Sequence, residues 1–174
     1  LFEELGAEII SDFVMPIRVW RRGYRVVYEP RAIASEFSGG SFGDEFRRRR
    51  RIVSRSLYGL WTQRGLLNPL AHFFFALQMI SHKVLRWSVP VLLLIALGVN
   101  IPLAADPFYR ILLALQGVFY LAAIMGNALP ERLGRLWPFY VPAYFCATNF
   151  GALLGLVNFL TGRRHSVWQP VSRV

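Results

Sequence analysis

The chain has 174 residues, of which 55% are hydrophobic and 15% aromatic, and its net charge is +10. High apolarity together with high basicity is typical of a membrane protein and argues against a soluble globular one. Acidic residues concentrate in the first third, since only Asp106 and Glu131 lie beyond residue 65. We therefore expect the first third to face water and the remainder to contain lipid-facing helices.

The chain begins at Leu1, without a Met or a charged-then-apolar leader. We therefore expect it to be the C-terminal part of a longer protein. Its single cysteine, Cys146, lies in an apolar run and excludes an internal disulfide and a cysteine metal site. His72, His82 and His165 are too scattered to indicate metal ligands, so no metal site is expected in this chain.

Residues 1–43 are interpreted as the end of an α/β domain. The spacing of apolar residues predicts a helix over roughly 12–22, with Ser11 as its N-cap and Gly23 as its stop. Residues 24–28 are β-branched and aromatic, and they predict a short strand. A lone helix and strand cannot bury a core, so we expect the missing layers of the domain to precede this chain.

A glycine-rich loop over 35–43 leads into residues 44–61, which are predicted to form one amphipathic helix. At about 100° per residue, an apolar stripe and an arginine face lie on opposite sides of this helix. The stripe comprises Phe46, Val53, Leu57, Leu60 and Trp61, and the arginine face comprises Arg48, Arg51 and Arg55. Such a helix suits the membrane interface, with its arginines directed at an anionic group. A solvated face or a lipid-headgroup patch is the alternative interpretation.

The apolar second half predicts an interfacial segment and three membrane spans. Residues 70–80 are apolar and aromatic but too short to cross a bilayer, so residues 44–83 are grouped as interfacial helices. The spans are expected at about 88–105, 108–129 and 139–161, inside a membrane region over 84–162 that is followed by a tail over 163–174.

The charges of the loops give a conflicting orientation. The positive-inside rule places residues 1–86 and the loop with Arg132 and Arg135 in the cytoplasm, and the 106–107 turn outside. Three spans would then leave the basic tail outside, against the same rule. Either the 70–82 segment dips far enough to change the parity or the tail disobeys the rule, and we favour a cytoplasmic tail.

Four polar residues fall within or at the ends of the spans: Gln116, Asn127, Asn149 and Asn158. Hydrogen bonding between helices is their simplest role. The alternative is a polar path for a carbohydrate. Its sugar-stacking surfaces would be Tyr109, Tyr120, Tyr140 and Tyr144, although tyrosines at the lipid boundary explain this pattern as well.

Three segments, taken in order, carry a family resemblance: Ile10–Phe13, Gly23–Pro30 and Glu45–Arg51. They resemble the C-terminal part of membrane-bound family 2 glycosyltransferases, the inverting enzymes of GT-A type that include cellulose, hyaluronan and poly-N-acetylglucosamine synthases. In that family an acidic motif ending in Asp opens a helix, a G-Y-x-V-x-Y-x-P segment follows, and a QxxRW-type motif lies on an interfacial helix before the last spans. The order and spacing match over about residues 8–90.

The resemblance implies a mainly α chain: the C-terminal fragment of an α/β GT-A catalytic domain, then an amphipathic interfacial helix and about three transmembrane helices. It implies that Asp12 is the general base for the acceptor hydroxyl. It also implies that Arg48 and Arg51 line the site where the nucleotide diphosphate and the acceptor meet, and Arg55 shares their face. An inverting displacement needs a carboxylate to take the hydroxyl proton and arginines to stabilise the leaving diphosphate.

The chain departs from the family pattern at Ser11, Arg48 and Ile52, where the family has an acidic residue, Gln and Trp. Without that Trp the claim of processive polymer synthesis is weaker, although Trp61 or Tyr58 could take its place. The nucleotide-binding aspartate of the family, and the DxD motif that holds a divalent metal (Mg or Mn), would lie upstream of this chain. The chain alone is therefore expected to be inactive.

The expected function is transfer of a sugar from a nucleotide-sugar donor to a glycan or lipid-linked acceptor. The reaction is expected at the cytoplasmic face of a bacterial inner or plasma membrane, in polysaccharide or cell-envelope biosynthesis. The alternative is a non-enzymatic membrane subunit whose basic helix binds anionic lipid or a partner, but that role has no use for Asp12. Nucleic acid is not an expected partner, because the spans tether the arginines to a bilayer.

Overall fold

The computed structural model describes Gly6, residues 9–35 and residues 41–163. These residues are mainly helical, which confirms the expected class, and no strand occurs among them. The helices are α1 (Ser11–Arg21), α2 (Phe42–Thr62), α3 (Pro69–Met79), α4 (Leu85–Leu103), α5 (Pro107–Ala128), α6 (Glu131–Gly134) and α7 (Trp137–Leu160). A 3₁₀ turn, Arg64–Leu67, precedes α3, and a π-helical turn, Ile80–Val84, joins α3 to α4.

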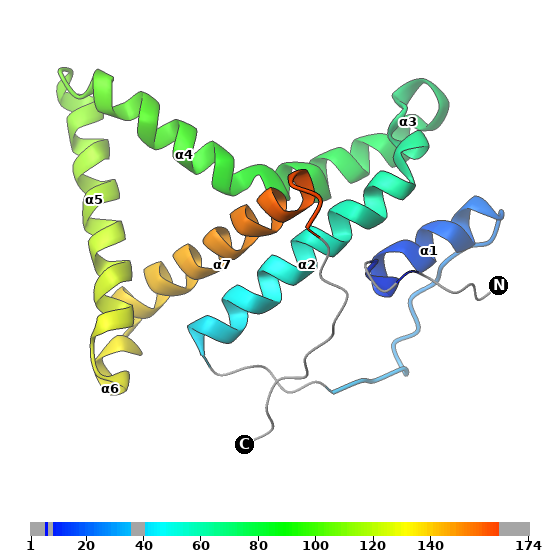
Figure 1. Cartoon of the computed structure of the whole chain (residues 1–174), viewed down its shortest axis with the longest axis horizontal. Helices are drawn as coiled ribbons and strands as arrows, with labels where there is room; N and C mark the ends of the chain where they lie inside the picture. The colour runs from blue at the N-terminus through cyan, green and yellow to red at the C-terminus, as the bar shows by residue number, and fades with distance from the viewer. Residues whose placement is uncertain (1–5, 7–8, 36–40, 164–174) are drawn as a thin grey trace.

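Three helices outline an open triangle (Figure 1): α4 and α5 are two of its sides and α7 is the third. Helix α2 runs beside α7, and α1 lies beside α2 on the side away from α7. A small core of Val53, Leu60, Trp87 and Ala152 is buried where α2, α7 and the start of α4 meet. The most extensive packing in the described part is therefore between α2 and α7.

Helix α1 confirms the predicted helix, but Ser11 is not its N-cap. Ile10 occupies the cap position with an extended backbone, and Ser11 begins the helix itself. The Ser11 hydroxyl donates to Asp12 Oδ1 at 3.3 Å and does not cap a backbone N–H. Gly23 ends the helix as expected, with a φ of +83° that favours glycine.

The predicted strand over 24–28 is not formed. The segment after Gly23 runs without regular secondary structure, and every residue from 21 to 35 is exposed. A strand is defined by its ladder to a neighbouring strand, and the described residues offer none. The β-branched and aromatic composition of this segment thus has no sheet to join within the described part.

Helix α2 confirms the predicted amphipathic helix and begins two residues earlier than expected, at Phe42. Ser41 caps it: the Ser41 hydroxyl oxygen accepts from the Asp44 backbone N–H at 3.1 Å and donates to Asp44 Oδ2 at 2.7 Å. Asp44 also pairs with Arg47 at 2.5 Å. Residues 36–40, which precede this cap, are not among the described residues. Most of the predicted loop over 35–43 therefore lies outside the described part of the chain.

Three helical stretches are long and apolar enough to cross a membrane: Pro69–Leu103, Pro107–Ala128 and Trp137–Leu160. The first contains both the predicted interfacial segment and the predicted first span. Figure 1 shows that the chain changes direction between α3 and α4, where the π-helical turn lies. Asp106 then caps α5, since its Oδ1 accepts from the Phe108 backbone N–H at 2.8 Å.

Candidate functional site

The apolar stripe of α2 is covered by α7 over most of its length, although Trp61 at its end stays exposed. Aromatic side chains meet at both ends of the pair, with ring centroids 5.3 Å apart for Phe42 and Tyr140 and 5.0 Å apart for Tyr58 and Phe159. Between them, Phe46 stacks on Phe150 at 5.7 Å. The stripe that was expected to rest on lipid therefore rests on a second helix of the same chain.

Two glycines let the backbones of α2 and α7 approach closely. A Cβ built at Gly151 would lie 2.6 Å from the carbonyl oxygen of Phe46, and one at Gly155 would lie 2.7 Å from the carbonyl oxygen of Arg50. Neither distance leaves room for a side chain. Arg50 thus lies at the α7 side of α2, with its Nε buried and without a hydrogen-bond partner among the described residues.

Helix α1 docks on the opposite side of α2, at the C-terminal part of the arginine face. Gly59 admits α1, because a Cβ there would lie 2.6 Å from Val14 Cγ2. Arg55 Nη2 donates to the carbonyl oxygen of Ile9 at 2.9 Å, just ahead of the first turn of α1. Asp12 lies in that first turn and is exposed. The proposed base and one of the predicted arginines therefore belong to one junction.

The other two predicted arginines lie farther along α2. Arg48 is exposed and pairs with Glu45, with Arg48 Nη1 3.8 Å from Glu45 Oε2. Arg51 is half-buried on the same side of the helix. Arg48 lies two turns before Arg55, about 10 Å along the helix axis at 1.5 Å per residue. The arginine face is thus a continuous stripe whose far end lies at a different feature, the pocket described next.

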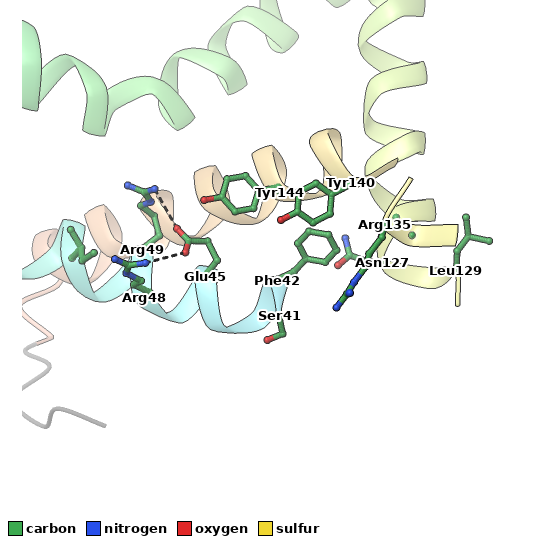
Figure 2. A pocket seen from close by; sticks show the side chains of 13 residues that line it. Ser41, Phe42, Glu45, Arg48, Arg49, Asn127, Leu129, Arg135, Tyr140 and Tyr144 are labelled. Carbon is green, nitrogen blue, oxygen red and sulfur yellow. Dashed lines mark hydrogen bonds and ion pairs between the residues drawn. The ribbon is translucent and has the colours of Figure 1, made fainter. Parts of the chain in front are cut away.

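This pocket, of about 680 Å³, lies between the first turns of α2 and the hairpin of α5, α6 and α7. Arg48, Arg49 and Arg135 bring positive charge to it, and Glu45 pairs with Arg49 at 3.3 Å. Figure 2 shows Tyr140 and Tyr144 along one wall, with their rings stacked at 6.0 Å. The pocket can therefore bind an anionic or polar group next to an aromatic surface.

Sequence reasoning missed Arg49 and Arg135 as pocket residues and the glycines of α7 as packing positions. The four-residue spacing of Gly151 and Gly155 is the small-residue pattern that lets membrane helices approach, and it is readable in the sequence. Arg135 carries no comparable signal, because its place in the pocket depends on how the hairpin folds back onto α2. The four tyrosines divide between two places: Tyr140 and Tyr144 line this pocket, and Tyr109 and Tyr120 line an apolar pocket between α4 and α5.

The acids near the site differ in their surroundings. The hydrogen bond from Ser41 and the Arg47 guanidinium hold the pKa of Asp44 below its usual range. Asp44 thus stays ionised at the positive end of the α2 dipole.

No group of three His, Cys, Asp or Glu side chains gathers anywhere in the described part of the chain. The divalent metal that the resemblance implies is expected on residues upstream of this chain, and no step below depends on it.

Comparisons with protein-family models, curated proteins and solved structures found no match to this chain.

Proposed function

We propose that this chain is the acceptor-side part of a membrane-bound inverting glycosyltransferase. It moves a sugar from a nucleotide-sugar donor to a glycan or lipid-linked acceptor at the cytoplasmic face of the membrane. Asp12 takes the proton of the acceptor hydroxyl, and the arginine face of α2 stabilises the negative charge on the departing diphosphate. The sugar donor and its metal bind to parts of the intact protein that precede these residues.

The contact between Arg55 and the Ile9 carbonyl is the observation that supports this proposal most. It joins the start of α1, which carries Asp12, to the helix that carries the arginines. The sharing of one side of α2 by α1 and the arginines also matters, because α7 covers the other side. A carboxylate and guanidinium groups along one open face are the groups that a displacement at a phosphorylated sugar needs.

The chemistry requires Asp12 for the proton and not for donor binding. A sugar hydroxyl is a poor nucleophile at neutral pH, and a positioned base typically contributes about 10²–10⁴-fold to such a step. Asp12 lies in the first turn of α1 with its side chain exposed. Its structural role there is small, because its side chain does not cap the helix.

Asp12→Asn in the intact protein tests the proposal, because Asn keeps the shape and cannot take the proton. We expect normal membrane levels, near-normal affinity for the nucleotide sugar, and sugar transfer reduced at least about 100-fold. Transfer is measured with radiolabelled donor in purified membranes. Asp44→Asn is the matched control, since Asp44 also lies in the first turn of a helix but bonds Ser41 and Arg47 instead. Transfer by Asp12→Asn at the level of this control would remove Asp12 from the mechanism.

A further inference from the structure

We propose that α7 does not cross the bilayer but lies with α2 in the membrane interface, so that among the described helices only α4 and α5 cross. All of the arginine helix, the α6 turn and the end of α7 then lie on one side of the membrane. The partner of this two-helix platform is the lipid surface itself. The proposal concerns membrane topology and does not depend on the glycosyltransferase chemistry.

The first step is that α2 and α7 form one packed unit. They run in the same direction, because the start of α2 meets the start of α7 at Phe42 and Tyr140, and the ends meet at Tyr58 and Phe159. The glycine contacts of α7 reach the α2 backbone itself. Figure 1 shows the two helices side by side over most of their lengths. Helix α7 therefore cannot cross the bilayer unless α2 crosses with it.

The second step is that α2 cannot cross the bilayer. The middle of this helix carries Arg49, Arg50 and Arg51, with Arg55 one turn later. An arginine at the centre of a membrane-spanning helix costs about 2.5–3.5 kcal/mol even on the scale of insertion experiments. The two acids of α2 lie in its first turn, where Asp44 pairs with Arg47 and Glu45 pairs with Arg48 and Arg49, and two carboxylates cannot neutralise six arginines. Because α2 stays at the surface and α7 packs along it, α7 also stays at the surface.

The third step is that α4 and α5 have the right lengths for two crossings. Helix α4 has 19 residues and α5 has 22, which correspond to about 28 and 33 Å against a hydrocarbon core of about 30 Å. The whole stretch Pro69–Leu103 has 35 residues and would extend about 52 Å if straight. The change of direction at the π-helical turn lets α4 cross while α3 remains near the surface.

The fourth step is the distribution of charge over the triangle. Arg132 and Arg135 lie in the turn between α5 and α7, and Lys83 and Arg86 lie where α4 begins. With α7 at the surface, Arg163 lies on the same side as these cations. The far corner, between α4 and α5, holds Asp106 and Arg110, and the guanidinium of Arg110 donates to the carbonyl oxygens of Ala104 and Ala105. Two crossings thus obey the positive-inside rule that three crossings break.

The uncovered side of α7 fits this placement. Side chains such as Val157 and Leu160 remain exposed on it, while α2 covers Gly151 and Gly155. An apolar face on one helix and an arginine face on its packed neighbour give the pair one side for lipid and one side for water, as in a single amphipathic interfacial helix. The apolar length of α7 is then used along the surface and not across it.

Single cysteines test the proposal in the full-length protein, in a Cys146→Ser background. Thr161→Cys marks the end of α7, Leu133→Cys marks the α6 turn, and Ala105→Cys marks the corner between α4 and α5. A membrane-impermeant maleimide is applied to right-side-out and to inside-out vesicles. We expect positions 133 and 161 to react from the same side and position 105 to react from the other. Reaction of positions 161 and 105 from the same side would overturn the proposal, because α7 would then cross.

A depth measurement separates a surface helix from one that enters and returns. Spin labels at Phe150→Cys and Val118→Cys mark the middles of α7 and α5, and both positions are exposed. Their accessibilities to oxygen and to a water-soluble nickel chelate give the depth of each label. We expect the label at position 118 at the bilayer centre and the label at position 150 at headgroup level. Equal depths for both labels would also overturn the proposal.

Discussion

The α2–α7 pair and the α4–α5 pair are held together differently. Helices α2 and α7 are in backbone contact, and α7 buries small residues against α2, among them Gly151, Ala152 and Gly155. Helices α4 and α5 meet near their shared corner, where the side-chain amides of Asn100 and Gln116 form a hydrogen bond of 3.0 Å. Over the rest of their lengths, large apolar side chains of α4 and α5 stay exposed.

Each pair is packed according to what surrounds it. Lipid tails are as apolar as the exposed side chains of α4 and α5, so burying those side chains between the two helices adds little stability. A polar contact therefore contributes more to this pair. Helix α2 combines arginines with an apolar stripe, and α7 removes that stripe from water. The more tightly packed pair is therefore the one that carries the charges, and it holds the candidate site in place.

The largest expected effect is a difference in turnover between substitutions on the two sides of α2. Arg51 lies on the side away from α7, while Arg50 lies at the α7 side. We expect Arg51→Ala to lower turnover by roughly 30–1000-fold, since a charge-assisted contact to the diphosphate contributes about 2–4 kcal/mol in the transition state. Arg50→Ala removes the same charge and should lower turnover far less. Equal losses in steady-state assays of the two variants would favour the alternative of a diffuse lipid-binding patch.

The next largest effect is a loss of stability when a substitution disrupts the packing of α2 on α7. Gly155→Leu would drive a side chain into the Arg50 carbonyl and Val53, and overpacking of this kind costs about 1–3 kcal/mol. Gly117→Leu is the matched control, because nothing lies within 4 Å of its Cβ position on α5. Both substitutions gain the same helix propensity. We expect a lower thermal unfolding midpoint in detergent for Gly155→Leu only. Similar midpoints for both variants would show that the glycine contacts do not hold α7 to α2.

The smallest effect concerns the α4–α5 pair. Asn100→Leu removes its hydrogen bond to Gln116, and such contacts inside membranes contribute about 0.6 kcal/mol on average and at most about 1.7. A double-mutant cycle with Gln116→Leu isolates the interaction, since either single change removes it. We expect a coupling energy within that range by unfolding in detergent. A coupling energy near zero would leave α4 and α5 joined by their turn and by lipid-facing packing alone.

Much of the local structure could be predicted from the sequence, because it depends on neighbouring residues. The apolar period of 44–61 predicted α2 and its two faces, and the stop at Gly23 follows from the backbone freedom of glycine. The breaks before α5 and α7 follow from Asp106-Pro107 and Trp137-Pro138, where proline is favoured in a first helical turn. The strand over 24–28 was wrong, because a strand also requires a partner that composition cannot supply.

Local sequence was enough to predict most helical stretches, which stretches are apolar enough for a membrane, and on which side of α2 the arginines lie. All of these follow from periodicity and length, which are local properties. Three long-range contacts became visible only in the folded chain: α7 packs on the apolar stripe of α2, Arg55 bonds the start of α1, and Arg135 lines the same pocket as Arg48 and Arg49. These contacts join residues far apart in the chain. Several of its apolar helices offer a face that could cover the stripe of α2, so the sequence pattern does not select one of them. The physical reason for the choice is close approach, since α2 can meet α7 at backbone distance only where Gly151 and Gly155 leave room.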